Sequence, residues 1–277
     1  MDGLYSTTHP LPMFHDGLPL HIHQRCSSCL QVQRSHASQL STCGGCGVAK
    51  YCSKACQVAH RPAHKAECNG HKAERLHLAE KTGMESAYAD LTAWIQYYDA
   101  PLRNCALACM RLPENPHMER DAFFCVALHH TGDLTLPIHN RFVVLEISRR
   151  GRDEIRLRPK LSASVSLQPK ACNCGKAEFG KSFYGCILMH IASFFGPDMN
   201  ALSERVMHFH IDKTLAKANI ARQDWSVLLR EYVELGAKMH FKCGKVPGAE
   251  DICCCGGWVH EEEKRRAFTD IGKKEEE

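Results

Sequence analysis

Apolar residues recur at steps of three and four in two stretches of the chain, which is the period of a helix with one buried face. The first stretch contains Tyr88, Leu91, Ile95, Tyr98, Leu102, Cys105 and Cys109. Pro101 falls inside it and is expected to start a second helix or to kink the first. The second stretch runs over residues 225–235, between an early Asp224 and Gly236, and predicts one amphipathic helix.

Other segments follow a strand-like pattern. Residues 141–150 are rich in β-branched and aromatic side chains and predict a strand, with residues 123–128 as a partner. Residues 155–158 and 164–167 are shorter strand candidates. The longest apolar stretch, residues 183–195, is too short for the roughly 20 residues of a membrane span and is expected to lie in a core.

The composition of the chain is that of a folded protein rich in cysteine. The chain has 277 residues, of which 44% are hydrophobic and 24% charged, typical of a folded chain with one small module and one ordinary domain. The first residues show no secretory pattern, so we expect the protein inside the cell, in the nucleus or the cytoplasm. Seventeen cysteines in a reducing compartment favour metal binding over disulfides.

Cysteine and histidine spacing then predicts the metal. Eight ligands are arranged as four pairs: Cys26 and Cys29, Cys43 and Cys46, Cys52 and Cys56, His64 and Cys68. Zinc takes four such ligands in a tetrahedron, so eight ligands imply two zinc ions in closed, structural sites. The last two pairs have the four-residue spacing of one helix face, which predicts two knuckles facing two short helices. Spacing alone allows sequential or interleaved pairing.

The residues around these ligands resemble the MYND zinc finger. Tyr51 precedes Cys52, the segment from Cys52 continues as Cys-Ser-Lys-Ala-Cys-Gln, and His64-Lys65 stands three residues before Cys68. The resemblance implies the interleaved pairing, with Cys26, Cys29, Cys52 and Cys56 on one zinc ion and Cys43, Cys46, His64 and Cys68 on the other. It covers residues 26–68.

The resemblance also implies a partner and a surface. MYND fingers bind short proline-containing peptides through a glutamine and a tryptophan four residues later. Here Gln57 is present but Arg61 occupies the tryptophan position. This departure bears on peptide recognition and leaves zinc binding unaffected. Gln57 and Arg61 are therefore the candidate peptide-binding residues.

The remainder of the chain is divided by composition. We expect a flexible segment over 1–25, a helical connector over 69–84, a mainly helical α+β domain of unknown function over 85–260, and a charged tail over 261–277. Cys172, Cys174 and the cysteines at 253–255 near His260 lack the spacing of known zinc sites, so a third metal is not expected. Cys105 and Cys109 lie in the apolar stripe and are expected to pack in the core.

Three functions remain as hypotheses. The first is a zinc-stabilised adaptor that binds another protein, in transcriptional regulation as the resemblance implies, with no catalytic and no cofactor-binding residues. The second is a SET-type lysine methyltransferase, because that family also carries MYND fingers, but its motifs are not found here. The third is direct DNA binding, which two observations disfavour. The formal charge of +4 counts each cysteine as neutral, and zinc-bound thiolates would make the net charge less positive. The arginines of residues 149–158 also have no aromatic neighbours for stacking on bases.

Overall fold

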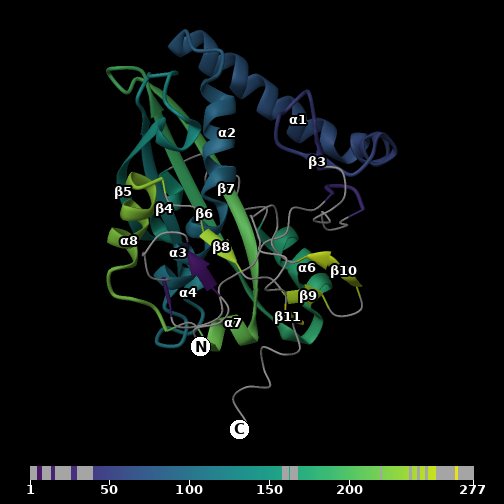
Figure 1. The fold of residues 1–277 in the computed structure, drawn as a ribbon. Coiled ribbons are helices and arrows are strands. Elements are labelled where there is room, and N and C mark those ends of the chain that lie inside the picture. The colour runs from purple at the N-terminus through teal and green to yellow at the C-terminus, as the bar shows by residue number, and fades with distance from the viewer. Residues whose placement is uncertain are drawn as a thin grey trace. The chain divides into compact units, whose positions relative to one another are not determined.

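The computed structural model describes residues 5–7, 14–15, 26–29, 40–157, 162, 168–218, 220–236, 239–241, 244–246, 249–253 and 266–267. The chain divides into two compact units (Figure 1). The first, here the finger unit, comprises residues 1–10, 21–77 and 238–277; the second, the sheet unit, comprises residues 11–20 and 78–237. Each is described separately below.

The finger unit is built from short strands and most of one long helix. Strand β2 (Ser41–Thr42) pairs antiparallel with β3 (Lys50–Tyr51), and β1 (Tyr5–Thr7) pairs antiparallel with β8 (Met239–Phe241). A third small sheet has the order β10, β9, β11 and contains Ala249–Cys253, Gly244–Val246 and Arg266–Ala267. Residues 266–267 are thus a strand inside the segment expected to be a charged tail.

Helix α1 (Lys54–Thr82) replaces the two short helices and the separate connector that the sequence predicted. It is continuous through Pro62, which removes the hydrogen bond to the carbonyl of Val58. Val58 is 60% exposed and residues 61–63 are exposed, so water can satisfy that carbonyl. The helix ends before Gly83, whose φ of 69° is a conformation that favours glycine. The prediction of two short helices was therefore wrong.

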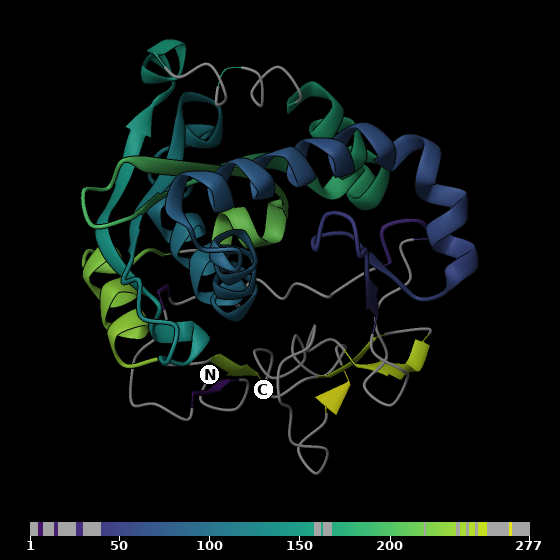
Figure 2. The same cartoon turned by 90° about the horizontal axis from the view of Figure 1, so that it is seen from above.

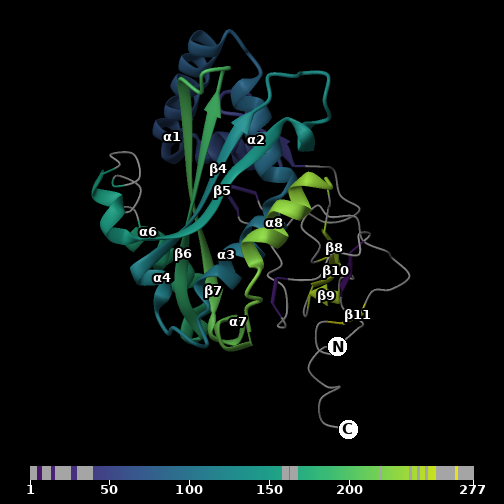
Figure 3. The ribbon, with the colours of Figure 1, turned by 90° about the vertical axis from the view of Figure 1, so that its left-hand side faces the viewer.

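The sheet unit is organised around four long strands in the order β5, β4, β6, β7 (Figure 3). Their bounds are β4 Ala122–His130, β5 Phe142–Gly151, β6 Phe183–Phe195 and β7 Ala201–Asp212. Strand β4 is antiparallel to β5 and parallel to β6, and β6 is antiparallel to β7. The predicted pairing of residues 123–128 with residues 141–150 is confirmed, and β5 is an edge strand of the sheet.

Helices cover both faces of this sheet, and their bounds are α2 Ala87–Tyr97, α3 Asp99–Met110, α4 Met118–Asp121, α6 Gln168–Phe179, α7 Lys213–Ala218 and α8 Trp225–Glu234. Helices α2, α3 and α8 pack on the face that carries Phe124 and Phe142, where Phe124 meets Trp225 and Phe142 meets Trp94. Figures 2 and 3 show α8 beside β5. Helix α6 lies on the opposite face, with Gly175 close to Phe183.

Helices α2, α3 and α8 follow the predicted pattern. Every residue of the stripe from Tyr88 to Cys109 is buried, and Cys105 donates to the carbonyl of Trp225 across 3.5 Å. Helix α2 ends at Tyr97 and α3 begins at Asp99, so Pro101 lies in the first turn of a second helix, as one of the two alternatives predicted. None of the helices in the described part of the chain has the length and apolar character to cross a membrane.

Two expectations about local structure fail. Residues 155–157 belong to a 3₁₀ helix over Arg152–Leu157 rather than to a strand, because β5 has already ended at Gly151 and Ile155 packs into the core beneath the sheet. Residues 164–167 lie outside the described residues. Phe14 and His15, inside the segment expected to be flexible, are buried in the sheet unit, where Phe14 stacks on Tyr232 at 5.2 Å between ring centroids.

A cluster of polar side chains links helix α2 to one end of strand β4. The carboxylate of Asp90 on α2 accepts from Arg141 across 2.8 Å and pairs with Nε2 of His130 on β4 across 3.3 Å. Burial lowers the pKa of His130, although the hydrogen bond to Asp90 partly opposes that shift. His130 therefore favours its neutral form in the folded protein.

Candidate metal centre

The first knuckle and the β2–β3 hairpin position four of the candidate ligands. Cys26 and Cys29 flank a tight turn, and the amide of Ser27 donates to the carbonyl of Lys50 on β3 across 2.7 Å. Cys43 and Cys46 flank a second turn between β2 and β3, where Gly47 has a φ of 71°. Tight turns of this kind aim both thiols of a pair in the same direction.

The second knuckle shows a sulfur-centred hydrogen-bond pattern. The backbone amides of Val48 and Ala49 donate to Sγ of Cys46 across 3.4 Å and 3.5 Å. The amide of Gly47 donates to the carbonyl of Cys43 across 2.8 Å, which closes the turn. These hydrogen bonds fix the position of Sγ of Cys46 within the turn.

Helix α1 supplies three of the remaining ligands. Cys56, His64 and Cys68 lie within it, whereas Cys52 precedes it. Ser53 caps the helix: its Oγ accepts from the amide of Cys56 across 3.2 Å, the arrangement expected of an N-terminal serine. The pair Cys52 and Cys56 therefore straddles a helix cap and does not lie on one helical turn, which corrects the sequence expectation.

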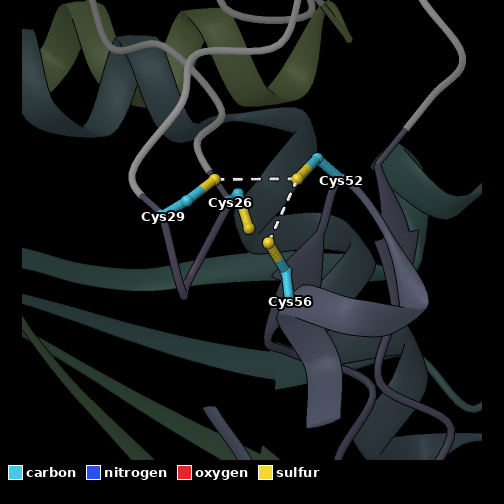
Figure 4. A group of neighbouring side chains, drawn as sticks. All are labelled: Cys26, Cys29, Cys52 and Cys56. Atoms are coloured by element: carbon cyan, nitrogen blue, oxygen red, sulfur yellow. Dashed lines mark hydrogen bonds between the residues drawn. The ribbon is translucent and has the colours of Figure 1, made fainter. Parts of the chain in front are cut away.

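The structure brings the eight residues together in two groups of four. Cys26, Cys29, Cys52 and Cys56 form one group, and their sulfurs lie within 4.8 Å of one another. Figure 4 shows these side chains pointing toward one another from the first knuckle and from the start of α1. Sγ of Cys52 is 3.6 Å from Sγ of Cys29 and 3.5 Å from Sγ of Cys56.

Cys43, Cys46, His64 and Cys68 form the second group, with ligand atoms again within 4.8 Å of one another. Sγ of Cys43 is 3.8 Å from Sγ of Cys68, and Sγ of Cys46 is 3.4 Å from Nε2 of His64. Each group combines one knuckle with residues at or on α1. This is the interleaved arrangement, and the sequential alternative, with the first four cysteines on one ion, is not what the structure shows.

The distances fit the geometry of zinc. A tetrahedron with zinc–sulfur bonds of about 2.3 Å has sulfurs about 3.8 Å apart, close to the separations in both groups. Gly45 adds a second indication of a compact site. A Cβ atom at that position would lie 2.9 Å from Sγ of Cys68, so the second knuckle approaches the helix more closely than a side chain would allow.

The electrostatics of the thiols also fit a bound cation. Burial would raise the pKa of Cys26 and Cys43, but backbone amide hydrogen bonds overcome it and bring each to about 6. In the same groups, hydrogen bonding to neighbouring thiols raises the pKa of Cys52 to about 12, and burial with neighbouring sulfurs raises that of Cys68 to about 11. Without compensation one thiol ionises and its neighbour stays protonated. A divalent cation removes this conflict and allows every thiol of the group to ionise.

Aromatic and acidic side chains support His64. Tyr51 is 2% exposed, its hydroxyl is 3.1 Å from Nδ1 of His60, and the ring of His60 stacks on that of His64 at 5.6 Å between centroids. Glu67 lies 3.7 Å from Nδ1 of His64. At this separation the carboxylate makes no hydrogen bond to the ring and acts on His64 through its charge. Spacing alone gave no signal for the roles of His60 and Glu67.

The candidate peptide-binding residues share a face of α1. Gln57 is partly exposed, and its Oε1 accepts from Nζ of Lys54 across 3.2 Å. Arg61 is exposed, one helical turn further on. The first turn of α1 contains no acidic residue, so Arg61 and Lys54 make this face positively charged.

Features outside the finger add no further metal group to the described residues. Cys172 and Cys174 lie in α6 and neither belongs to a cluster; Cys254, Cys255 and His260 lie outside the described residues. The arginines of β5 and its continuation bond within the chain: Arg149 to the carbonyl of Cys109, Arg150 to Glu146 and Glu154, and Arg152 to the carbonyl of Glu119. This internal use of the guanidinium groups gives no support to a DNA-binding surface.

The site thus defines a class of protein, one with a small cross-braced module folded around two structural metal ions. Residues 26–68 match the family model of the MYND finger. The chain therefore contains a MYND-type zinc finger, a protein-interaction module that binds two zinc ions. Comparison with the curated proteins gives no match, and comparison with the solved structures gives none.

Proposed function

We propose that the protein is an adaptor that acts inside the cell, in the nucleus or the cytoplasm, and uses its zinc finger to bind another protein in transcriptional regulation. The observation that carries this proposal is the pair of four-ligand groups, which have no position left for a substrate or a water molecule. The zinc holds the fold of an interaction module and does not perform chemistry.

In this proposal each of the eight residues is a zinc ligand. Cys26, Cys29, Cys52 and Cys56 hold the first ion, and Cys43, Cys46, His64 and Cys68 hold the second. All seven thiols bind as thiolates, and His64 binds through Nε2, the atom that faces Cys46. The segment has few large apolar residues, so binding free energy of about 10–16 kcal/mol per structural zinc is the main source of its stability.

The proposed partner is a short proline-containing peptide that contacts Gln57 and Arg61. An extended peptide can add to the edge of a two-stranded sheet through main-chain hydrogen bonds. Ser27 already occupies the outer edge of β3, because it exchanges hydrogen bonds with Lys50 across 2.7 Å and 3.2 Å. The peptide would therefore pair with β2, whose residues Ser41 and Thr42 are exposed. The positive charge of Arg61 favours a peptide with an acidic residue beside its proline.

The test is a comparison of protein partners captured by the zinc-loaded chain and by the double variant Gln57→Ala/Arg61→Ala. Lys72→Ala is the matched control, because Lys72 is an exposed cation about 16 Å further along the same helix. We expect the double variant to keep two zinc ions and lose partners that the control keeps. An unchanged set of partners would show that this face of α1 is not the contact surface.

A further inference from the structure

The sheet unit contains a second polar cluster, made by one side chain from each of three neighbouring strands. Sγ of Cys125 on β4 is 3.5 Å from Nδ1 of His190 on β6, and Nε2 of His190 is 3.1 Å from Oε1 of Glu204 on β7. Cys125 and His190 are direct partners in the parallel ladder, so their side chains share one sheet face. Both nitrogens of the imidazole are thus engaged, one by a thiol and one by a carboxylate.

Apolar side chains surround this cluster. Cys125 packs with Phe123, Leu188 and Ile155, and Val206 lies against the same group. Cys125 and His190 are buried, whereas Glu204 is partly exposed. Further along the same face, toward the end of the sheet, Val143 is 51% and Leu202 41% exposed. Leu202 is two residues from Glu204 on β7, so an accessible apolar side chain lies at the carboxylate end of the cluster.

The order of the three groups is that of an activated nucleophile. A thiol next to an imidazole can transfer its proton to the ring, and a carboxylate on the other nitrogen orients the ring and stabilises its positive form. Two other buried cysteines provide a contrast within the same unit. Burial raises the pKa of Cys109 to about 12 and that of Cys186 to about 12, which leaves them protonated and inert.

We propose that Cys125, His190 and Glu204 form a nucleophilic thiol site that takes apolar α,β-unsaturated carbonyl compounds. His190 accepts the thiol proton, and the sulfur of Cys125 forms a bond to the β-carbon as the carbon–carbon π bond breaks. The imidazolium then returns the proton to the α-carbon. The addition has no leaving group and requires no oxidant or reductant.

Addition fits this site better than acyl transfer does. An acyl-transfer site needs hydrogen-bond donors for a developing oxyanion. Strand β4 is paired on both sides, with β5 and with β6, so the backbone amides around Cys125 are committed to the sheet. The apolar neighbours of Cys125 select the body of the substrate, and Glu204 disfavours an anionic one.

The experiment uses the zinc-loaded full-length chain and two probes that differ by one carboxylate, N-phenylmaleimide and 4-maleimidobenzoate. Modification rates at pH 7 are measured for each cysteine by peptide mass spectrometry. An ordinary thiol is about 3% ionised at pH 7, so complete activation raises the rate by up to about 30-fold. We expect Cys125 to react with N-phenylmaleimide at least tenfold faster than Cys109 or Cys186.

Variants test whether His190 and Glu204 activate Cys125 or whether its reaction rate reflects only its exposure. Glu204→Gln keeps the shape of the side chain and an acceptor oxygen but removes the charge. We expect this variant to lower the rate of Cys125 modification at least fivefold and to leave the melting temperature unchanged. His190→Gln should slow it further. Glu234→Gln is the matched control, because Glu234 is an exposed carboxylate of the same unit on α8, which packs on the other face of the sheet.

Three results would overturn the proposal. The first is a Cys125 rate no higher than those of Cys109 and Cys186. The second is an unchanged rate in folded Glu204→Gln. The third concerns substrate class: relative to exposed Cys174, Cys125 should prefer the apolar probe at least fivefold, and equal preference would exclude an apolar site.

Discussion

Substitution of Gly45 by alanine tests whether Cys68 is held by zinc. The added Cβ would lie 2.9 Å from Sγ of Cys68, whereas comfortable non-bonded contacts between heavy atoms are about 3.5–4.0 Å. The sulfur or the knuckle must therefore move by about 0.6–1 Å. A free thiol can rotate away, but a zinc ligand tolerates a displacement of only about 0.2 Å. The substitution should therefore be costly only when zinc is bound.

Overpacking of this size costs about 1–3 kcal/mol, which corresponds to roughly 5- to 150-fold weaker zinc binding at the second site. Gly44→Ala is the control, because a Cβ at Gly44 has no atom within 4 Å. The assay is competition with a chromogenic chelator, which resolves the tight and the weakened zinc ion. Equal zinc affinities in Gly45→Ala and Gly44→Ala would refute the placement of Cys68 in this site.

Three further predictions follow from described contacts. Removing the helix cap with Ser53→Ala should cost about 1 kcal/mol and weaken zinc at the first site about fivefold, measured by the same competition, with no change at the second site. Arg61→Trp restores the residue typical of the family and should tighten binding of a proline-containing peptide that lacks an acidic residue, measured by fluorescence anisotropy; weaker or unchanged binding would contradict the assigned surface. Burial lowers the pKa of His130 and of His208, so below about pH 6.5 the unfolded chain binds protons that the folded chain does not. The sheet unit should therefore lose stability as the pH falls from about 6.5, and chemical unfolding should show a weaker pH dependence in His130→Gln.

The zinc site was the part of the molecule most completely predictable from the sequence. Ligand types and spacings fix the number of ions, because zinc has one preferred coordination number. The pairing of ligands was not fixed by spacing, since it depends on which knuckle meets the helix. The resemblance implied the interleaved arrangement, and the structure shows it in the distances between Cys43 and Cys68 and between Cys46 and His64.

The fold of the sheet unit was predictable only in part. The helical stripe from Tyr88 to Cys109 was found because one buried face leaves a clear period. Strand β6, over residues 183–195, was recognised only as a buried stretch, because a strand covered on both faces has no alternation to distinguish it from a buried helix. Strand β7 was missed because polar residues such as Ser203 and Arg205 interrupt its apolar pattern, although both are buried.

The relay of Cys125, His190 and Glu204 could not be predicted from the sequence. Its members are 65 and 14 residues apart along the chain and meet only because β4 and β6 are parallel neighbours and β7 follows β6 as an antiparallel partner. The signal that could have indicated it is a histidine and a cysteine inside two apolar strands. That signal is weak, since cysteine is often buried for packing alone.

Helix α1 has a consequence for how zinc occupancy is transmitted through the chain. An isolated helix is expensive to nucleate, and the exposed residues beyond Cys68 have little tertiary packing to stabilise them. Zinc coordination through Cys56, His64 and Cys68 supplies that nucleus at one end, and burial of Leu78 supplies an anchor at the other. The intervening turns therefore depend on metal that they do not bind, so loss of zinc should appear as a loss of helix content well outside the finger.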